Sequence, residues 1–90
     1  MHSREAAALL GYIAANVRRL RKKRGLSQER FAEAAGLDSR FTQRVERGRV
    51  NFSIETLVRL AAALDTTPGA LLRRARLSPP TPGRPKKRAR

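Results

Sequence analysis

The stretch from Leu26 to Gly48, LSQERFAEAAGLDSRFTQRVERG, constrains the fold of this chain more than any other part of it. It predicts two short helices that are joined by a tight turn at Gly36. Ser27 and Asp38 are favourable N-cap residues, because their side-chain oxygens accept hydrogen bonds from the free N–H groups of a first helical turn. Gly36 can adopt the left-handed conformation that ends a helix. A helix pair with such a turn is the unit that places its second helix in the major groove of DNA.

The apolar pattern outside this stretch predicts three more helices. Before it, apolar residues recur at helical spacing from Leu10 to Leu20. After it, Ser53 is an N-cap for a segment with an apolar stripe, and Thr67 precedes a proline suited to the first position of a last helix. The stripe of that fourth segment consists of Ile54, Leu57, Val58, Ala61 and Leu64. We therefore expect an all-α fold with helices at 4–24, 27–35, 39–47, 53–64 and 68–76.

A chain of 90 residues allows one small domain. We assign residues 1–77 to this domain. The remaining segment 78–90, SPPTPGRPKKRAR, is rich in proline and has almost nothing to bury, so we expect a disordered basic tail. Its Pro82–Lys87 portion resembles part of an AT-hook, which lays Gly-Arg-Pro into the minor groove of A·T-rich DNA. Pro82 stands where that motif has a basic residue, and this favours a nonspecific basic tail instead.

The formal net charge of the chain is +14. The domain is itself basic, since residues 1–76 contain 16 of the 21 basic residues and all 7 acidic ones. Such a field favours polyanions, nucleic acid before an anionic membrane, because no large apolar face opposes the charges. The segment RRLRKKR at 18–24 leaves two interpretations open. Its cations are either solvated and favoured at a helix C-terminus, or they contact phosphates.

Several classes of function are disfavoured by the residues that the chain lacks. There is no cysteine, which excludes disulfides, thiolate metal sites and cysteine nucleophiles. The single histidine, His2, lies at the N-terminus, and no His/Asp/Glu cluster has metal-ligand spacing. We therefore expect no enzyme activity, no metal, no cofactor and no small-molecule ligand. We also expect no signal peptide and no association with a membrane, because no apolar run approaches the roughly 18 residues of a span.

The central stretch resembles the phage-repressor and Cro-like helix-turn-helix family, also called the XRE family. The matching residues are Arg21, Arg24, Gly25, Leu26, Ser27, Gln28, Phe31, Ala32, Ala35, Gly36, Leu37, Glu46, Arg47 and Gly48. The resemblance continues through Asn51, Ser53, Leu57, Ala61, Leu64, Pro68, Leu71 and Leu72. It implies a compact five-helix, lambda-repressor-like domain with its helix-turn-helix at 27–47. It also implies a cytoplasmic, nucleoid-associated protein of a bacterium or phage that binds double-stranded DNA.

Base recognition requires side chains that match base edges. Arginine can donate two hydrogen bonds to guanine, and glutamine can pair with adenine. In the family, base contacts come from the positions that match Ser39, Arg40, Gln43 and Arg44. We expect Arg40 and Arg44 to contact guanine, Arg40 first, and the alternative for each is a phosphate contact or solvation.

The resemblance also implies backbone contacts and one structural ion pair. The positions expected to contact phosphates are Ser27, Gln28, Arg47, Arg49 and Asn51, and the free N–H groups at the start of the first helix of the pair favour such contacts. In the family, the residue matching Arg21 pairs with the one matching Glu46. We expect this pair to orient the recognition helix more than to add net stability, since desolvation offsets much of its attraction.

Two departures from the family pattern affect local packing. Thr42 replaces a buried Ile or Val, so its hydroxyl needs a partner such as a backbone carbonyl one turn back. Phe41 stands where the family often has Thr or Tyr, and we expect it to pack in the space beside Thr42 or, alternatively, to touch a thymine methyl or sugar. Phe52 replaces the usual proline after Asn51.

These features together predict a sequence-specific DNA-binding transcriptional regulator, a repressor or autoregulator, that binds as a homodimer. The expected dimer surface consists of Leu64, Thr67, Leu71, Leu72 and Leu77. Restriction–modification controllers, antitoxins and mobile-element repressors remain equally open as its class. A nonspecific nucleoid-associated binder driven by charge and tail, and an adaptor or antitoxin acting through a protein partner, are the alternatives.

Overall fold

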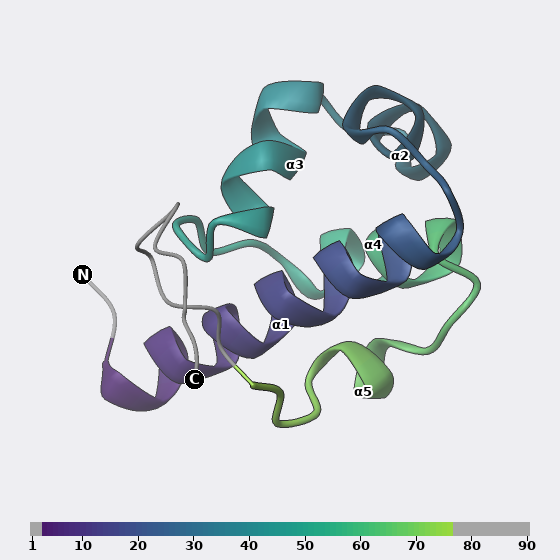
Figure 1. The fold of residues 1–90 in the computed structure, drawn as a ribbon. Helices are drawn as coiled ribbons and strands as arrows, with labels where there is room; N and C mark the ends of the chain where they lie inside the picture. Colours follow the sequence, from purple (N-terminus) through teal and green to yellow (C-terminus); the bar gives the residue numbers. More distant parts are fainter. Residues whose placement is uncertain (1–2, 77–90) are drawn as a thin grey trace, which may run out of the picture.

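The computed structural model describes residues 3–76, and this part of the chain is entirely helical apart from turns and loops (Figure 1). Its elements are α1 (Arg4–Lys23), α2 (Gln28–Ala35), α3 (Ser39–Glu46), α4 (Ile54–Ala63) and α5 (Pro68–Leu71). The predicted all-α class is confirmed, and the bounds of α1 to α4 agree with the predicted ones to within a residue. Leu77, the 78–90 tail with its AT-hook-like portion, and His2 lie outside the described residues.

Each of these helices is capped at its N-terminus by a side-chain oxygen. The N-cap side chain accepts a backbone N–H of the first turn in each case, and the N-caps are Ser3, Ser27, Asp38, Ser53 and Thr67. Between α2 and α3, Gly36 has a φ of 69°, the left-handed conformation that costs a residue with a Cβ about 1 kcal/mol or more. The predicted helix-turn-helix unit is therefore formed, with both caps and the turn glycine in their predicted roles.

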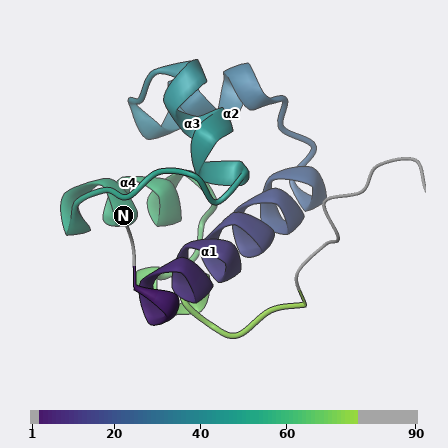
Figure 2. The same ribbon diagram turned by 90° about the vertical axis from the view of Figure 1, so that its left-hand side faces the viewer.

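The core lies where α1 crosses beneath the α2–α3 pair, with α4 and α5 closing its other sides (Figures 1 and 2). Helix α1 packs against α3 and α5, α2 packs against α3 and α4, and α4 packs against α5. The largest side chains that are almost fully buried are Val17, Phe31, Thr42, Val45, Leu60 and Leu71. The core is aliphatic apart from one phenylalanine, and it fixes α3 on α1 so that the outer side of α3 faces solvent.

The predicted apolar stripe of α4 is partly wrong. Leu57, Ala61 and Leu64 are buried, but Ile54 and Val58 are 74% and 45% exposed. Leu60, which the predicted stripe omits, is completely buried. The reason is that α4 carries apolar residues around more than one face, and helical spacing alone does not show which of these faces meets the core.

The last helix is shorter than predicted, because α5 ends at Leu71 instead of continuing to Arg76. Asn16 of α1, which is 3% exposed, explains this difference. Its Nδ2 donates to the carbonyl oxygens of Leu71 at 2.9 Å and of Arg73 at 3.0 Å. The side chain therefore satisfies carbonyls that end the helix, and the chain runs along α1 instead.

Candidate functional site

The outer face of α3 carries the four residues that are predicted to contact bases. Arg40 and Arg44 are exposed, and Ser39 and Gln43 are half-buried beside them. Gln43 Nε2 lies 3.4 Å from Ser39 Oγ, so these two polar side chains are neighbours on one turn. Within residues 3–76, neither arginine forms an ion pair. Both guanidinium groups are therefore free to bind a phosphate or the edge of a guanine base. The structure thus brings all four residues onto one solvent-facing surface.

The expected phosphate contacts flank this surface at two places. At the start of α2, the Ser27 hydroxyl oxygen accepts the N–H of Arg30 at 3.0 Å, which leaves its proton free to donate. After α3, Arg47, Arg49 and Asn51 are exposed on the loop that leads to α4. Asn51 Oδ1 accepts the N–H of Phe52 at 2.8 Å, so this residue also shapes the loop.

Glu46, the last residue of α3, is held by two side chains from other elements. Arg21 Nε lies 2.6 Å from Glu46 Oε2, and Arg21 Nη2 lies 3.1 Å from Glu46 Oε1. The pair is buried, with Arg21 9% and Glu46 3% exposed. Gln28 Nε2 is 3.4 Å from the same carboxylate, which joins the start of α2 to the end of α3. The expected Arg21–Glu46 ion pair is present, and it ties α1, α2 and α3 together.

Arg18 is a residue of this site that the sequence analysis did not single out. Its Nη1 donates to the backbone carbonyl oxygen of Glu46, so α1 holds the end of α3 through the backbone as well as through the side chain. The signal in the sequence was the spacing, because Arg18 and Arg21 are three residues apart and share a face of α1. A charged donor at a helix C-terminus also interacts favourably with its dipole.

The two departures from the family pattern are accommodated within α3. Thr42 is 1% exposed, and its Oγ1 donates to the carbonyl oxygen of Ser39 at 2.9 Å, as the sequence analysis expected. Phe41 packs edge-on against Phe52, with the ring centroids 6.4 Å apart and the rings at 75°. Both phenylalanines contact the edge of the core, and this supports the packing role that we expected for Phe41.

The predicted dimer surface needs correction. Leu64 and Leu71 are 2% and 0% exposed, because they fill the core between α1, α4 and α5, and they are not available to a second chain. Thr67 caps α5 through its hydroxyl. Leu72 is 37% exposed, and Leu77 lies outside the described residues. Only Leu72 among the described leucines of that set keeps an exposed apolar side chain.

A different set of apolar side chains is exposed, and we call it the apolar patch. It consists of Leu9, Ile54, Val58 and Leu72. Three of these residues, Leu9, Ile54 and Leu72, line a groove of about 300 Å³ between the first half of α1, the start of α4 and the end of α5. No charged residue lines this groove. Its lining therefore differs from the basic surface of the rest of the molecule.

Other chemical features of the described part of the chain are few. Residues 3–76 contain no group of three or more His, Cys, Asp or Glu side chains that could hold a metal ion. None of the described helices has the length and apolar character needed to cross a membrane. Arg74 Nε donates a hydrogen bond to the Tyr12 hydroxyl at 3.4 Å, and this hydrogen bond raises the pKa of Arg74.

Comparison with known proteins places this geometry in a family. The model of the helix-turn-helix family HTH_3 matches residues 17–71, which include the α2–turn–α3 unit and the Arg21–Glu46 pair. The chain belongs to this family. The resemblance to XRE-type helix-turn-helix proteins is thereby confirmed, and DNA-binding transcriptional regulation is the activity that the family and its members support.

Three relatives illustrate the similarity. The control protein C.SmaI of Serratia marcescens is 44% identical over 62 residues, which are 69% of this chain and 74% of that protein. The crystal structure of the restriction-modification controller protein C.AhdI from Aeromonas hydrophila is 42% identical with a TM-score of 0.66, over 69% of this chain and 94% of that one. The hypothetical transcription factor NHTF from Neisseria is 36% identical with a TM-score of 0.70, over 74% and 75% of the two chains.

Proposed function

We propose that this protein is a sequence-specific transcriptional regulator that reads the major groove of double-stranded DNA with α3. The observation that carries the proposal is the outer face of α3, where Arg40 and Arg44 are exposed and free of ion pairs within residues 3–76. Arginine on such a helix can donate two hydrogen bonds to guanine, and Gln43 can donate one hydrogen bond to adenine and accept another from it. Arg40, near the start of α3, is the principal base contact.

Backbone contacts on both sides of α3 set the register. Ser27 and Gln28 at the start of α2 present a hydroxyl, an amide and free N–H groups to one phosphate. Arg47, Arg49 and Asn51 face the backbone beyond the other end of α3. These contacts supply affinity without sequence information, so the specificity resides in α3.

The regulator acts as a homodimer that associates through the apolar patch. Two chains with a net charge of +14 repel each other over most of their surface, whereas the groove beside Leu9, Ile54 and Leu72 has no charged lining residue. Burial of these side chains contributes roughly 25 cal/mol for each Å² removed from water. A twofold dimer would place two α3 helices in successive major grooves, about 34 Å apart. Sedimentation at tens of micromolar tests this, and a monomer both with and without DNA contradicts it.

The regulatory role closest to the relatives is that of a controller. Two similar proteins, C.SmaI and C.AhdI, are named as control or controller proteins, the second of them in restriction–modification. This similarity supports a repressor or autoregulator of a restriction–modification locus over an antitoxin or a mobile-element repressor. A reporter fused to the promoter of the protein's own gene tests the role, because an autoregulator changes that reporter's output as its own level rises.

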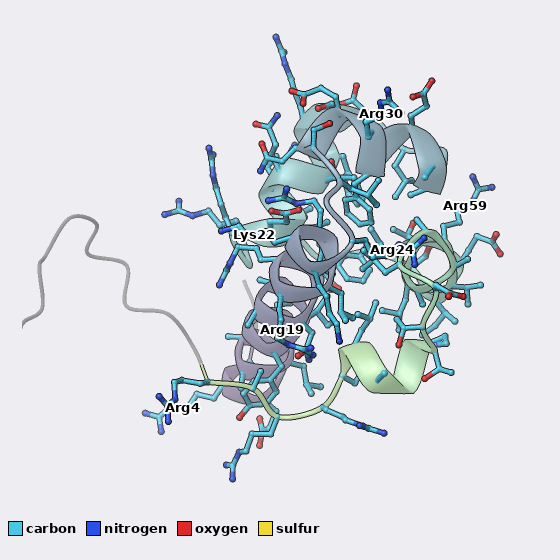
Figure 3. The ribbon with its side chains drawn as sticks, turned by 45° about the vertical axis from the view of Figure 1, so that its right-hand side comes forward. Arg4, Arg19, Lys22, Arg24, Arg30 and Arg59 are labelled. Carbon is cyan, nitrogen blue, oxygen red and sulfur yellow. The ribbon has the colours of Figure 1, made fainter. Side chains whose placement is uncertain are left out.

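The experiment that tests specific recognition is selection of bound duplexes from a random DNA pool at near-physiological salt. The wild type, Arg40→Ala and the matched control Arg4→Ala are compared, since Arg4 lies at the far end of α1 (Figure 3). An enriched palindrome whose half-site changes only with Arg40→Ala supports reading by α3. Enrichment of no sequence, or of A·T-rich tracts that depend on the tail, indicates the charge-driven binder instead.

A further inference from the structure

A second cationic feature lies on α1, outside the helix-turn-helix. It is a pocket of about 290 Å³, and four of its seven lining residues are basic. The basic residues are Arg18, Arg19, Lys22 and Arg76, and the others are Ala15, Asn16 and Ala75. Figure 3 shows Arg19 and Lys22 projecting from the second half of α1. We call this the α1 pocket.

Asn16, which lines the α1 pocket, fixes the position of the residues around it. Asn16 anchors the segment after α5 by donating to the carbonyls of Leu71 and Arg73. The same side chain accepts a hydrogen bond from Arg19 Nη2 at 3.1 Å through its Oδ1. Asn16 therefore fixes both walls, the α1 wall and the 73–76 wall. Because Arg19 is already oriented, an anion would find it in place rather than having to order it.

Local charge compensation does not account for this cluster. No carboxylate lines the pocket. The carboxylates that form ion pairs within residues 3–76 are Glu46, Asp65 and Glu55, and their arginine partners are not pocket residues. The negative end of the α1 dipole favours cations in its last turn, which explains Lys22. The helix dipole does not explain Arg76, which belongs to the segment after α5 and lines the same pocket. Four basic residues that line one pocket with no carboxylate in the lining can bind a phosphate group.

Arg18 connects the α1 pocket to the DNA-reading surface. It lines the pocket, and its Nη1 donates to the carbonyl oxygen of Glu46 at the end of α3. Gln28, an expected phosphate contact at the start of α2, approaches the carboxylate of the same Glu46. The pocket, the end of α3 and the start of α2 therefore meet around one residue.

We propose that the α1 pocket binds a backbone phosphate of the DNA strand that flanks the bases read by α3. The proposal rests on the proposed function and adds a contact outside the helix-turn-helix itself. It also decides between the two interpretations of the segment 18–24, because the residues that line the pocket are assigned to phosphate and the rest of that segment is not.

The test is the salt dependence of DNA binding by the full chain with Lys22→Gln and Arg76→Gln combined. Both side chains are exposed, and neither has a hydrogen-bond or ion-pair partner within residues 3–76, so the fold should be retained. The matched control combines Arg4→Gln and Arg73→Gln, which removes the same charge outside the pocket. Circular dichroism checks that all three proteins are folded.

The plot of log affinity against log salt has a slope of about −0.9 for each phosphate contacted. We expect the pocket variant to reduce the steepness of this slope by about 0.9, for the one phosphate that the pocket holds, and to weaken binding equally for operator and scrambled duplexes. The control variant should keep nearly the wild-type slope. Equal slopes for the two double variants would overturn the proposal.

A second arm separates DNA phosphate from a free phosphorylated ligand. Inorganic pyrophosphate is added to each protein without DNA, and the melting temperature is measured. If pyrophosphate stabilises the wild type but not the pocket variant, while the DNA slopes are equal, the site belongs to a free ligand and the DNA assignment is overturned. If the wild type binds operator and scrambled duplexes equally, the proposed function fails, and the slope on any duplex still tests the pocket.

Discussion

At the scale of single residues, Glu46 has the largest number of roles. Its carboxylate accepts hydrogen bonds from Arg21 and Gln28, and its backbone carbonyl oxygen accepts one from Arg18. Glu46→Ala leaves the Arg21 guanidinium buried without its partner, and we expect the free energy of unfolding to fall by about 3–5 kcal/mol. Thermal or urea denaturation measures this change. A melting temperature equal to that of the wild type would contradict the assignment.

A double variant separates orientation from stability at the same place. Arg21→Met combined with Glu46→Leu removes both charges and keeps apolar volume, so most of the lost stability should return. DNA affinity should stay low, because the carboxylate no longer joins α2 to the end of α3. Full recovery of both stability and operator affinity would show that the ion pair does not orient the recognition helix.

Replacement of Thr42 by valine is expected to raise the stability of the protein, in contrast to replacement of Glu46 by alanine. Its hydroxyl is buried and bonds to a carbonyl inside its own helix, which already accepts intrahelical bonds. Thr42→Val keeps the shape and removes the polar group, and we expect the free energy of unfolding to rise by up to about 1 kcal/mol. Thr42→Ser removes a buried methyl and should lower it by about 1 kcal/mol. Urea denaturation of both variants checks the order, and a Val variant less stable than the Ser variant would refute it.

At the scale of elements, the N-cap of α3 links stability to recognition. Asp38 Oδ2 accepts the N–H groups of Arg40 and Phe41 at 3.0 and 3.2 Å. Asp38→Ala should lower the free energy of unfolding by about 1 kcal/mol. It should also weaken operator binding, because the first turn of α3 carries Ser39 and Arg40.

The matched control for this prediction is Ser53→Ala at the start of α4. Ser53 Oγ accepts the N–H of Thr56 at 3.1 Å, so its loss should cost a similar amount of stability. Because α4 contributes no predicted base contact, operator affinity measured well below the melting temperature should be unchanged. Equal losses of affinity in the two variants would mean that α3 is not the reading helix.

The elements also show what the sequence could and could not predict. Helix starts are local, because each is decided by one side-chain oxygen and the nearby N–H groups, and the sequence predicted the caps of α2 to α5. The buried face of a helix and the residue at which it ends depend on contacts with residues that are distant in the sequence. The exposure of Ile54 depends on which face of α4 meets α2 and α5, and the early end of α5 depends on Asn16, more than fifty positions earlier in the chain.

The candidate site divides in the same way. The exposed residues of α3 follow from helical spacing and from the position of the turn at Gly36. The Arg21–Glu46 pair was expected from the family pattern, not from the residues alone. The contribution of Arg18 and the convergence of Arg76 on the α1 pocket require the packing of α3 and of the segment after α5 onto α1.

At the scale of the whole molecule, charge and association are linked. Ile54 is 74% exposed in the monomer, so Ile54→Lys should change its stability by no more than about 0.5 kcal/mol. In a dimer formed through the apolar patch, it buries a charge at the interface, and we expect monomers in sedimentation. Ala34→Lys adds the same charge on the exposed side of α2 and should leave association intact. A dimer of unchanged stability with Ile54→Lys would place the interface elsewhere.

The central claim is that α3 reads base edges, and one comparison of affinities tests it most directly. Wild type and Arg40→Ala are titrated, at one fixed salt concentration, onto the duplex enriched by selection and onto a scrambled duplex of the same composition. Loss of a bidentate guanine contact costs about 1–3 kcal/mol, so Arg40→Ala should weaken operator binding roughly 5- to 150-fold and scrambled binding much less. An equal loss on both duplexes would make Arg40 a phosphate contact and would contradict specific reading by α3.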